Sequence, residues 1–230
     1  MFDLDVLLPD LWSILGAVPQ TLAMAFTIFV LSTIIGSLYA FIERRHIPVL
    51  RQFVVAYKVT FKGVPMVIVI FLAYYGLPPV FQFLASLLGM TLDGDAMPNW
   101  VIIIVALTAC VAAFQAEVVK GALNSFDTGQ ADAAYSLGYK SSQLFRRILF
   151  PQAVVAAIPD LANSFMVIMK ALSLAFAIEV VDIFAQAQLT AALNYYYLEA
   201  FVIAVVIYMV IAYLVTHLAD RTERALRMRT

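Results

Sequence analysis

Long apolar runs, separated by short polar segments, set the pattern of this chain. A helix needs about 20 consecutive apolar residues to cross a bilayer, and the runs approach or reach that length. The pattern therefore predicts five transmembrane spans, at approximately 19–42, 55–77, 99–115, 158–181 and 198–219. We expect an all-α membrane protein with one domain over residues 1–230.

Some segments near the spans have features of their own. Residues 4–16 are predicted to form a short interfacial helix, because Trp12 suits a membrane boundary. Residues 78–98 contain several prolines and are predicted to form an external connection. Lys58 and Lys62 lie near the start of the second span, where long cationic side chains reach the interface.

Composition agrees with a membrane protein. Of the 230 residues, 64% are hydrophobic and 13% are charged. Soluble domains are typically about 45–50% apolar and about 25% charged. Cys110, the single cysteine, lies in an apolar run and is expected to be a packing residue. His46 and His217 lack metal-ligand spacing, so no metal site is expected.

The placement of Lys and Arg predicts how the spans are oriented. Segments 1–17, 78–98 and 183–197 contain neither residue, whereas the segments after the first, third and fifth spans are basic. Because cytoplasmic loops carry an excess of Lys and Arg, we expect the amino terminus outside and the carboxyl terminus in the cytoplasm. The basic residues are Arg44, Arg45, Arg51, Lys120, Lys140, Arg146, Arg147, Arg221, Arg224, Arg227 and Arg229.

Residues 127–151 form the one long segment whose polar and charged residues are typical of a solvent-exposed region that binds another protein. Asp127 and Gln130 have the spacing of a capping box, which predicts the start of a helix. Gly138 can adopt the left-handed conformation that ends a helix. Small side chains on one side of this helix would allow another backbone to approach closely. They are Ala131, Ala133 and Ala134.

A second short helix is expected to follow. Ser141 or Ser142 is predicted to cap it, and Pro151 is predicted to follow its end. The product is two short helices that meet at an angle. The basic residues beside them are Lys140, Arg146 and Arg147.

This segment resembles the EAA loop of the membrane subunits of ATP-binding-cassette (ABC) importers. That loop reads Glu-Ala-Ala, three residues, glycine, nine residues and Ile-x-Leu-Pro. The same spacing is found here in Asp132-Ala133-Ala134, Gly138 and Ile148-Leu149-Phe150-Pro151. Two positions depart, since aspartate stands for glutamate and phenylalanine for leucine, but charge and apolarity are kept.

A wider stretch, most of residues 60–180, is similar to the polar amino acid permeases. The matching runs include Phe61-Lys62-Gly63-Val64-Pro65, Tyr74-Tyr75-Gly76-Leu77-Pro78 and Lys170-Ala171-Leu172-Ser173-Leu174. Lys62 replaces an arginine, Val64 a threonine, and Ala171-Leu172 a more polar pair. The less polar pair and the run 173–176 resemble cystine-type permeases.

The resemblance implies a permease subunit with the type I ABC importer fold, five spans and a cytoplasmic coupling loop at 116–157. Two permeases, identical or homologous, would pair within the lipids of a bacterial plasma membrane. Partner ABC ATPase subunits would carry ATP and Mg, and an extracellular or periplasmic binding protein would deliver a polar amino acid or derivative, cystine among them. The residues implied in ATPase coupling are Gln130, Ala131, Asp132, Ala133, Ala134, Leu137, Gly138, Arg146, Arg147 and Pro151.

Lys170 lies near the middle of the fourth predicted span. A cation there normally faces protein or a water-filled cavity, so it either lines a substrate path or pairs with Glu117 or Asp160. Ser173 lies three residues after Lys170 and would share its helix face. Glu179 would lie about 13 Å from Lys170 along a straight helix, where it either contacts a substrate amine or is an interfacial residue. The candidate substrate-path residues are Lys170, Ser173, Gln115, Asn163 and Glu179.

Other functions fit the sequence less well. A secondary transporter or channel subunit independent of an ATPase would need an inverted repeat and broken helices in both halves, and neither is evident. A membrane-embedded enzyme would need reactive groups on facing spans, and only Lys170 is central. No Gly-x-x-x-x-Gly-Lys-Ser/Thr loop is present, so we expect the chain itself to bind no ATP or other cofactor. No nucleic-acid partner is expected.

Overall fold

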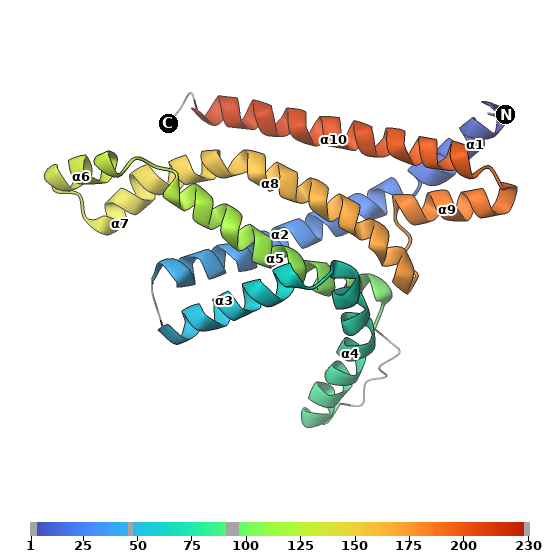
Figure 1. The fold of residues 1–230 in the computed structure, drawn as a ribbon, viewed down its shortest axis with the longest axis horizontal. Coiled ribbons are helices and arrows are strands. Elements are labelled where there is room, and N and C mark those ends of the chain that lie inside the picture. Colours follow the sequence, from blue (N-terminus) through green and yellow to red (C-terminus); the bar gives the residue numbers. More distant parts are fainter. Residues whose placement is uncertain (1–3, 46–47, 91–96, 228–230) are drawn as a thin grey trace.

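The computed structural model describes residues 4–45, 48–90 and 97–227, and its regular elements are helices (Figure 1). Their bounds, in chain order, are α1 (Leu4–Leu15), α2 (Val18–Arg44), α3 (Pro48–Gly63), α4 (Met66–Leu87), α5 (Asn99–Asn124), α6 (Thr128–Ser136), α7 (Ser141–Leu144), the π-helical turn η2 (Phe145–Leu149), α8 (Phe150–Leu172), the 3-10 helix η3 (Ser173–Ile178), α9 (Ile183–Asn194) and α10 (Tyr197–Arg227).

Five helical segments within the described ranges are long and apolar enough to cross a membrane, which confirms the predicted number of spans. They are Leu7–Arg44, Met66–Leu87, Asn99–Asn124, Ser141–Ile178 and Tyr197–Arg227. The short helix predicted near the amino terminus is also found, as α1. Three stretches named above, His46, residues 91–96 and Arg229, lie outside the described residues.

The second predicted span, 55–77, is not one helix. The chain ends α3 at Gly63 and starts α4 at Met66, with Pro65 in an extended conformation at the start of α4 (φ −56°, ψ 134°). Proline disfavours a helical conformation in the residue before it, which explains a break at this point. The crossing segment is therefore α4, and the Lys-bearing α3 is a separate helix.

The external connection predicted from residue 78 begins later than expected. Pro78 and Pro79 lie inside α4, which continues to Leu87. Apolar helices in membranes tolerate proline more readily than soluble helices do, because neighbouring groups can satisfy the freed backbone carbonyls. The proline pair therefore does not end the span.

The centre of the bundle is the contact between α2 and α5. Small residues, Ser32, Gly36 and Ala40, recur every four positions on the buried side of α2. A Cβ added at Gly36 would lie 2.6 Å from the Gln115 Cβ and 2.8 Å from the Ala116 backbone nitrogen. Small residues at this spacing let membrane helices approach closely, so Gly36 sets the distance between α2 and α5.

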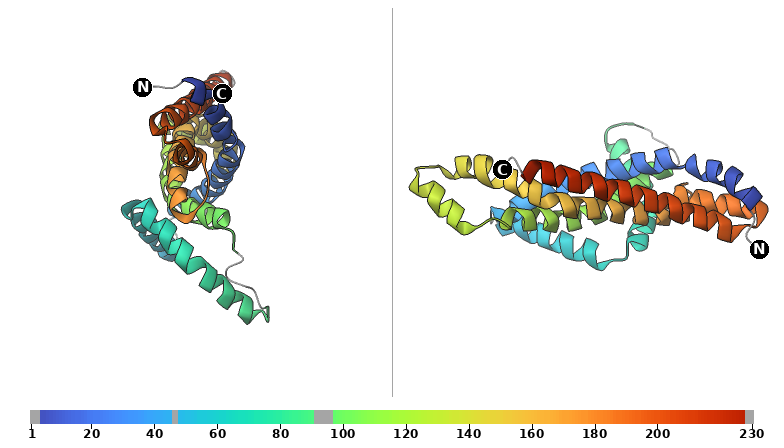
Figure 2. Two further views of the ribbon diagram at one scale, coloured as in Figure 1. Left: turned by 90° about the vertical axis from the view of Figure 1, so that its right-hand side faces the viewer. Right: turned by 90° about the horizontal axis from the view of Figure 1, so that it is seen from above.

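Helix α4 leaves this bundle at an angle (Figures 1 and 2). Only 11% of its most apolar window is buried within the chain, against 61% for the corresponding window of α5. Its exposed side chains are almost all apolar, Phe71, Leu72 and Phe83 among them. Such a surface must face lipid or another membrane protein.

The polar residues at the far end of the bundle tie α9 in place, a helix that the sequence pattern did not predict. Asp182 precedes α9 and accepts a hydrogen bond from the Ala185 amide at 2.9 Å, and another from the Tyr208 hydroxyl at 3.0 Å. Asn194, at the other end of α9, donates to the Asp10 carboxylate of α1. Both carboxylates are buried.

The segments predicted to be cytoplasmic gather at one end of the molecule (Figure 1). The end of α2, the start of α3, the helices α6 and α7, and the end of α10 lie there, whereas α1 and α9 lie at the opposite end. The basic segments thus share one end of the molecule, and two of the helices from non-basic segments, α1 and α9, lie at the other, while α4 points away from the bundle.

Candidate functional site

Residues 127–149 form a projecting elbow at the basic end of the molecule (Figure 1). The Asp127 carboxylate accepts a hydrogen bond from the Gly129 amide at 2.9 Å and so caps α6, as predicted. Gly138 follows α6 with φ +82°, which confirms its left-handed conformation. A side chain at this position would be strained whatever the space around it.

The predicted capping box is not formed, because the Asp127 carboxylate accepts from the Gly129 amide and not from the Gln130 amide. Gln130 does not return a bond to the Asp127 amide; its Oε1 instead accepts a hydrogen bond from Gln152 Nε2 of α8 at 2.9 Å. This contact crosses the elbow and joins the start of α6 to the start of the fourth span. Gln130 therefore couples the two arms rather than closing one helix end.

The second arm of the elbow differs from the prediction in two ways. Lys140, not a serine, precedes α7, and its amide donates to Gln143 Oε1 at 2.9 Å. The helix also does not end before Pro151, since η2 carries it directly into α8. Pro151 lies at the second position of α8, directly after the π-helical turn η2, and the helix passes through the proline without ending. The second arm is thus continuous with a membrane span.

The elbow has a small apolar core of its own. Ala134, Leu144 and Leu149 are buried there. The partly buried side chains packed around them are Phe126, Ala131, Tyr139, Phe145 and Ile148. Two of the three alanines expected to leave room for a partner are therefore at least partly buried inside the elbow, and only Ala133 is fully on its surface.

The tip of the elbow presents an apolar side chain to its surroundings. Leu137 is 79% exposed, directly before Gly138. Asp132, Arg146 and Arg147 are also exposed, and none of them forms an ion pair with a described residue. The elbow thus combines an apolar interior with an exposed apolar tip and with charges that have no ion-pair partner among the described residues.

The predicted substrate-path residues are only partly brought together. Lys170 and Ser173 line one cavity of about 390 Å³ between α8 and α10, with Tyr208 on its other side. The Ser173 hydroxyl donates to the Lys170 carbonyl at 2.6 Å. Lys170 is exposed in the last turn of α8 rather than in the middle of a span.

Neither ion pair suggested for Lys170 is made. Within the described residues no carboxylate lies within ion-pair distance of it, and Glu117 pairs with Lys58 instead. A straight helix from Lys170 to Glu179 is also wrong, because α8 ends at Leu172 and Glu179 is in the left-handed region at φ 60°.

The other three candidates lie apart from that cavity. Gln115 is completely buried against α2, and in the described part of the chain neither its Nε2 nor its Oε1 has a hydrogen-bond partner. Asn163 is exposed on α8, and Glu179 is exposed after η3. None of the three lines the cavity that Lys170 and Ser173 share.

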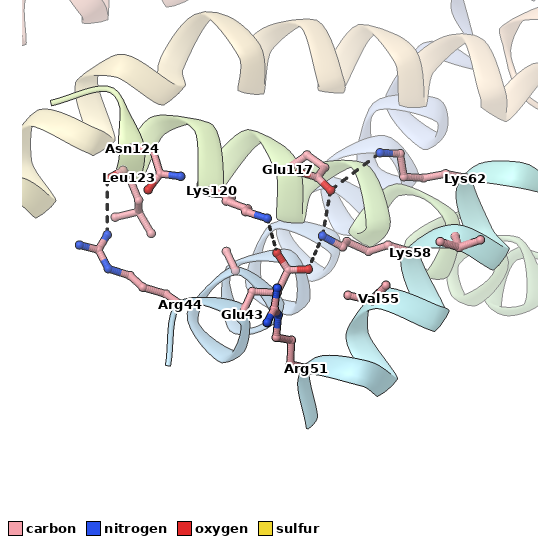
Figure 3. A pocket seen from close by; sticks show the side chains of 12 residues that line it. Glu43, Arg44, Arg51, Val55, Lys58, Lys62, Glu117, Lys120, Leu123 and Asn124 are labelled. Carbon is pink, nitrogen blue, oxygen red and sulfur yellow. Dashed lines mark hydrogen bonds and ion pairs between the residues drawn. The ribbon is translucent and has the colours of Figure 1, made fainter. Parts of the chain in front are cut away.

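A cluster of charges that the sequence did not reveal joins α2, α3 and α5 (Figure 3). Glu43 pairs with Lys58 through one oxygen and with Lys120 through the other, the latter at 2.7 Å. Lys58 also donates to Glu117 at 2.8 Å, and Lys62 lies 3.9 Å from the same carboxylate. The signal available was weak: acidic and basic residues at the ends of three apolar runs.

The electrostatics of the cluster centre on Lys58, which is buried on α3. Burial by itself would lower the pKa of Lys58, but its hydrogen bonds with Glu117 and Glu43 outweigh this effect and hold the pKa above its usual value. Lys58 therefore stays charged and ties α3 to the bundle.

Comparisons with known proteins agree on one family. The family model for the binding-protein-dependent transport system inner membrane component matches residues 46–228. The probable amino-acid permease protein YxeN of Bacillus subtilis (strain 168) is 36% identical, over 93% of this chain and 91% of its own length. The probable amino-acid ABC transporter permease protein PatM of Vibrio harveyi is 34% identical, over 98% and 96%. The L-cystine transport system permease protein TcyL of B. subtilis (strain 168) is 30% identical, over 93% and 87%.

Solved structures share the fold. A chain in the crystal structure of an amino acid ABC transporter with histidines superposes with a TM-score of 0.82 and 24% identity, over 98% of this chain and 99% of that chain. A chain of the MetNI methionine ABC transporter in an inward-facing conformation gives a TM-score of 0.69 and 22% identity, over 95% and 98%. This chain therefore belongs to the family of binding-protein-dependent transport system inner membrane components and is an ABC importer permease with the type I importer fold.

Proposed function

We propose that this chain is the permease subunit of an ATP-driven importer of a polar amino acid or a close derivative. In this proposal the elbow docks on a partner ABC ATPase, which holds ATP and Mg. The observation that carries the proposal is the elbow itself, a helix pair with its own apolar core and an exposed Leu137 at its tip. A stiff element with an unsatisfied apolar tip suits a socket on another protein.

The second arm of the elbow gives the proposal a route for force. Because α7, η2 and α8 are continuous, a push on the elbow moves the fourth span as one body. The 23 residues of α8 extend about 35 Å at 1.5 Å per residue. Lys170 lies at the far end of that lever, so docking and the proposed substrate cavity are mechanically linked.

The cavity between α8 and α10 supports a substrate with a carboxylate. An exposed ammonium at Lys170, without a carboxylate partner among the described residues, suits an amino acid carboxyl group. Among the relatives, TcyL is named for L-cystine. We include cystine among the candidate substrates, delivered by an extracellular or periplasmic binding protein.

Two further parts of the proposal concern assembly and orientation. The exposed apolar side chains of α4 suit a second permease, either another copy or a homologue. The gathering of basic segments at the elbow end suits a cytoplasmic location for the elbow and carboxyl terminus, with the amino terminus outside.

The docking part is tested by replacing Leu137 with Asp and measuring how much ATPase co-purifies when the permease is expressed with its neighbouring genes. Leu193, which is 87% exposed on α9 at the opposite end, offers the same substitution as a control. We expect Leu137→Asp to lose the ATPase and Leu193→Asp to retain it. Normal ATPase recovery with Leu137→Asp would refute docking through the elbow tip.

A further inference from the structure

A cavity of about 480 Å³ opens at the basic end of the molecule, between α2, α3 and α5 (Figure 3). Five cationic side chains and two carboxylates line it, which leaves an excess of three positive charges. The cations are Arg44, Arg51, Lys58, Lys62 and Lys120, and the carboxylates are Glu43 and Glu117. The cavity is therefore attractive to an anion.

The charges in the cavity are not equally available. Both oxygens of Glu43 are engaged by lysines, and Lys58 is shared between two carboxylates. Arg51 is different, since it is exposed and has no carboxylate within ion-pair distance in the described chain. Arg44 is also exposed and has no carboxylate within ion-pair distance among the described residues, but it makes one long hydrogen bond, 3.4 Å, to the Leu123 carbonyl, and its guanidinium lies over the Phe145 ring, 5.9 Å from the ring centre. Arg51 is thus the guanidinium most available to an anion, and Arg44 lines the same cavity beside it.

An apolar strip leads out of the cavity along α3. Val55 and Val59 line the cavity and are 43% and 69% exposed. They lie one and two turns beyond Arg51 on the same helix. A ligand that fills the whole cavity therefore needs an anionic group beside an apolar chain.

We propose that this cavity binds the phosphodiester headgroup of an anionic phospholipid of the phosphatidylglycerol type. Arg51, assisted by Arg44, holds the phosphate oxygens, and an acyl chain follows Val55 and Val59. Guanidinium groups suit phosphate because their N–H groups can donate in pairs to its oxygens. Basic pockets between helices at the cytoplasmic surface are recognised sites for anionic lipid headgroups. The same phosphate chemistry would admit a soluble phosphate, but the valine strip favours the lipid.

Bound lipid would hold α3 at the bilayer surface. The helix is fixed to the bundle through Lys58 and breaks from α4 at Val64-Pro65. A headgroup at Arg51 would anchor the other end of α3. The lipid site is separate from the elbow tip, so its failure would leave the proposed ATPase docking untouched.

The test is native mass spectrometry of the full chain in detergent, titrated with phosphatidylglycerol or phosphatidylcholine. We expect wild-type protein to retain phosphatidylglycerol preferentially. Arg51→Gln should weaken its binding about fivefold, and Arg51→Gln with Arg44→Gln about 30-fold, the factors implied by ~1 kcal/mol per cation near a membrane surface. The single variant keeps the Arg44 contacts, so a folding defect in the double variant does not remove the test.

The matched control is Arg221→Gln with Arg224→Gln, which removes the same charge from exposed positions near the end of α10, outside the cavity. The end of α10 lies at the same end of the molecule (Figure 1). We expect the control to bind phosphatidylglycerol as wild type does. Three results would each overturn the lipid site: equal binding of the two lipids, equal loss in the control and cavity variants, or displacement of phosphatidylglycerol by inorganic phosphate at equal concentration. The last would assign the cavity to a soluble phosphate.

Discussion

Replacing Gly36 by alanine tests the contact at the centre of the bundle. The added Cβ would lie 2.6 Å from the Gln115 Cβ, 2.8 Å from the Ala116 nitrogen and 2.9 Å from the Gln115 carbonyl carbon. Two of these three atoms belong to the backbone of α5, so no side-chain rotation relieves the clash. Ordinary carbon contacts begin near 3.5 Å, and α2 and α5 must therefore separate by roughly 1 Å.

The expected loss of stability follows from two opposing effects. Overpacking of a tight core contact typically destabilises by about 1–3 kcal/mol. Alanine in place of glycine inside a helix stabilises the helix by up to about 1 kcal/mol in water. The variant Gly121→Ala measures this gain in helix propensity without a steric clash. Gly121 lies on α5, and a Cβ there meets nothing within 4 Å. We therefore expect Gly36→Ala to be less stable than Gly121→Ala by about 1–3 kcal/mol.

The measurement is reversible unfolding of each variant in mixed micelles with increasing denaturing detergent, followed by circular dichroism. Wild type, Gly36→Ala and Gly121→Ala are compared under one set of conditions. If Gly36→Ala proved as stable as Gly121→Ala, the close approach of α2 and α5 would not be a packing constraint, and the explanation of the small-residue spacing on α2 would be wrong.

Three further predictions concern charged groups. Glu43→Gln removes the carboxylate that pairs with both Lys58 and Lys120, and we expect the free energy of unfolding to fall by about 1–3 kcal/mol in the same assay. This is less than the loss of about 3–5 kcal/mol when a fully buried pair is broken, because Lys120 is 45% exposed. An unchanged stability would mean that the cluster does not hold α3. Burial raises the pKa of the Asp182 carboxyl above 3.8. The stability that Asp182 contributes is therefore fully present at pH values below the pKa of the unfolded chain and is lost as the pH rises through the folded-state pKa. Asp182→Asn should flatten the dependence of the unfolding midpoint on pH, and an unaltered slope would contradict this. Lys170→Met should abolish uptake without loss of assembly, and normal uptake would remove Lys170 from the substrate path.

Features encoded within one stretch of sequence were predictable. The spans follow from run length, and the start of α6 and the turn after it follow from Asp127 and Gly138, whose preferences are local. The break at Val64-Pro65 also has a local cause, the proline. A span predicted from the apolarity of about 20 consecutive residues does not detect it. The continuity of α7 with α8 differs from the prediction, because proline favours the end of a helix but does not require it, and here the π-helical turn η2 joins the two helices directly before Pro151.

Contacts between distant residues were not predictable. Glu43 and Lys120 are 77 positions apart, and their pairing depends on how α2 lies against α5. The same holds for Lys170, whose suggested partner Glu117 is taken by α3. The spacing of residues along one helix does not determine which neighbouring helix will supply the partner for a charged side chain. Gln115 stands out in the sequence as a polar residue within an apolar run, but its burial against Gly36 depends on the close packing of α2 and α5.

The most direct test of the coupling proposal is uptake of labelled amino acids by proteoliposomes that contain the assembled transporter and its binding protein. We expect uptake with ATP on the ATPase side and none with a non-hydrolysable analogue. Gly138→Asp, which forces a side chain into the left-handed turn at φ +82°, should insert normally and lose ATP-driven uptake. Uptake driven by an ion gradient without ATP, or full ATP-driven uptake in Gly138→Asp, would contradict the account.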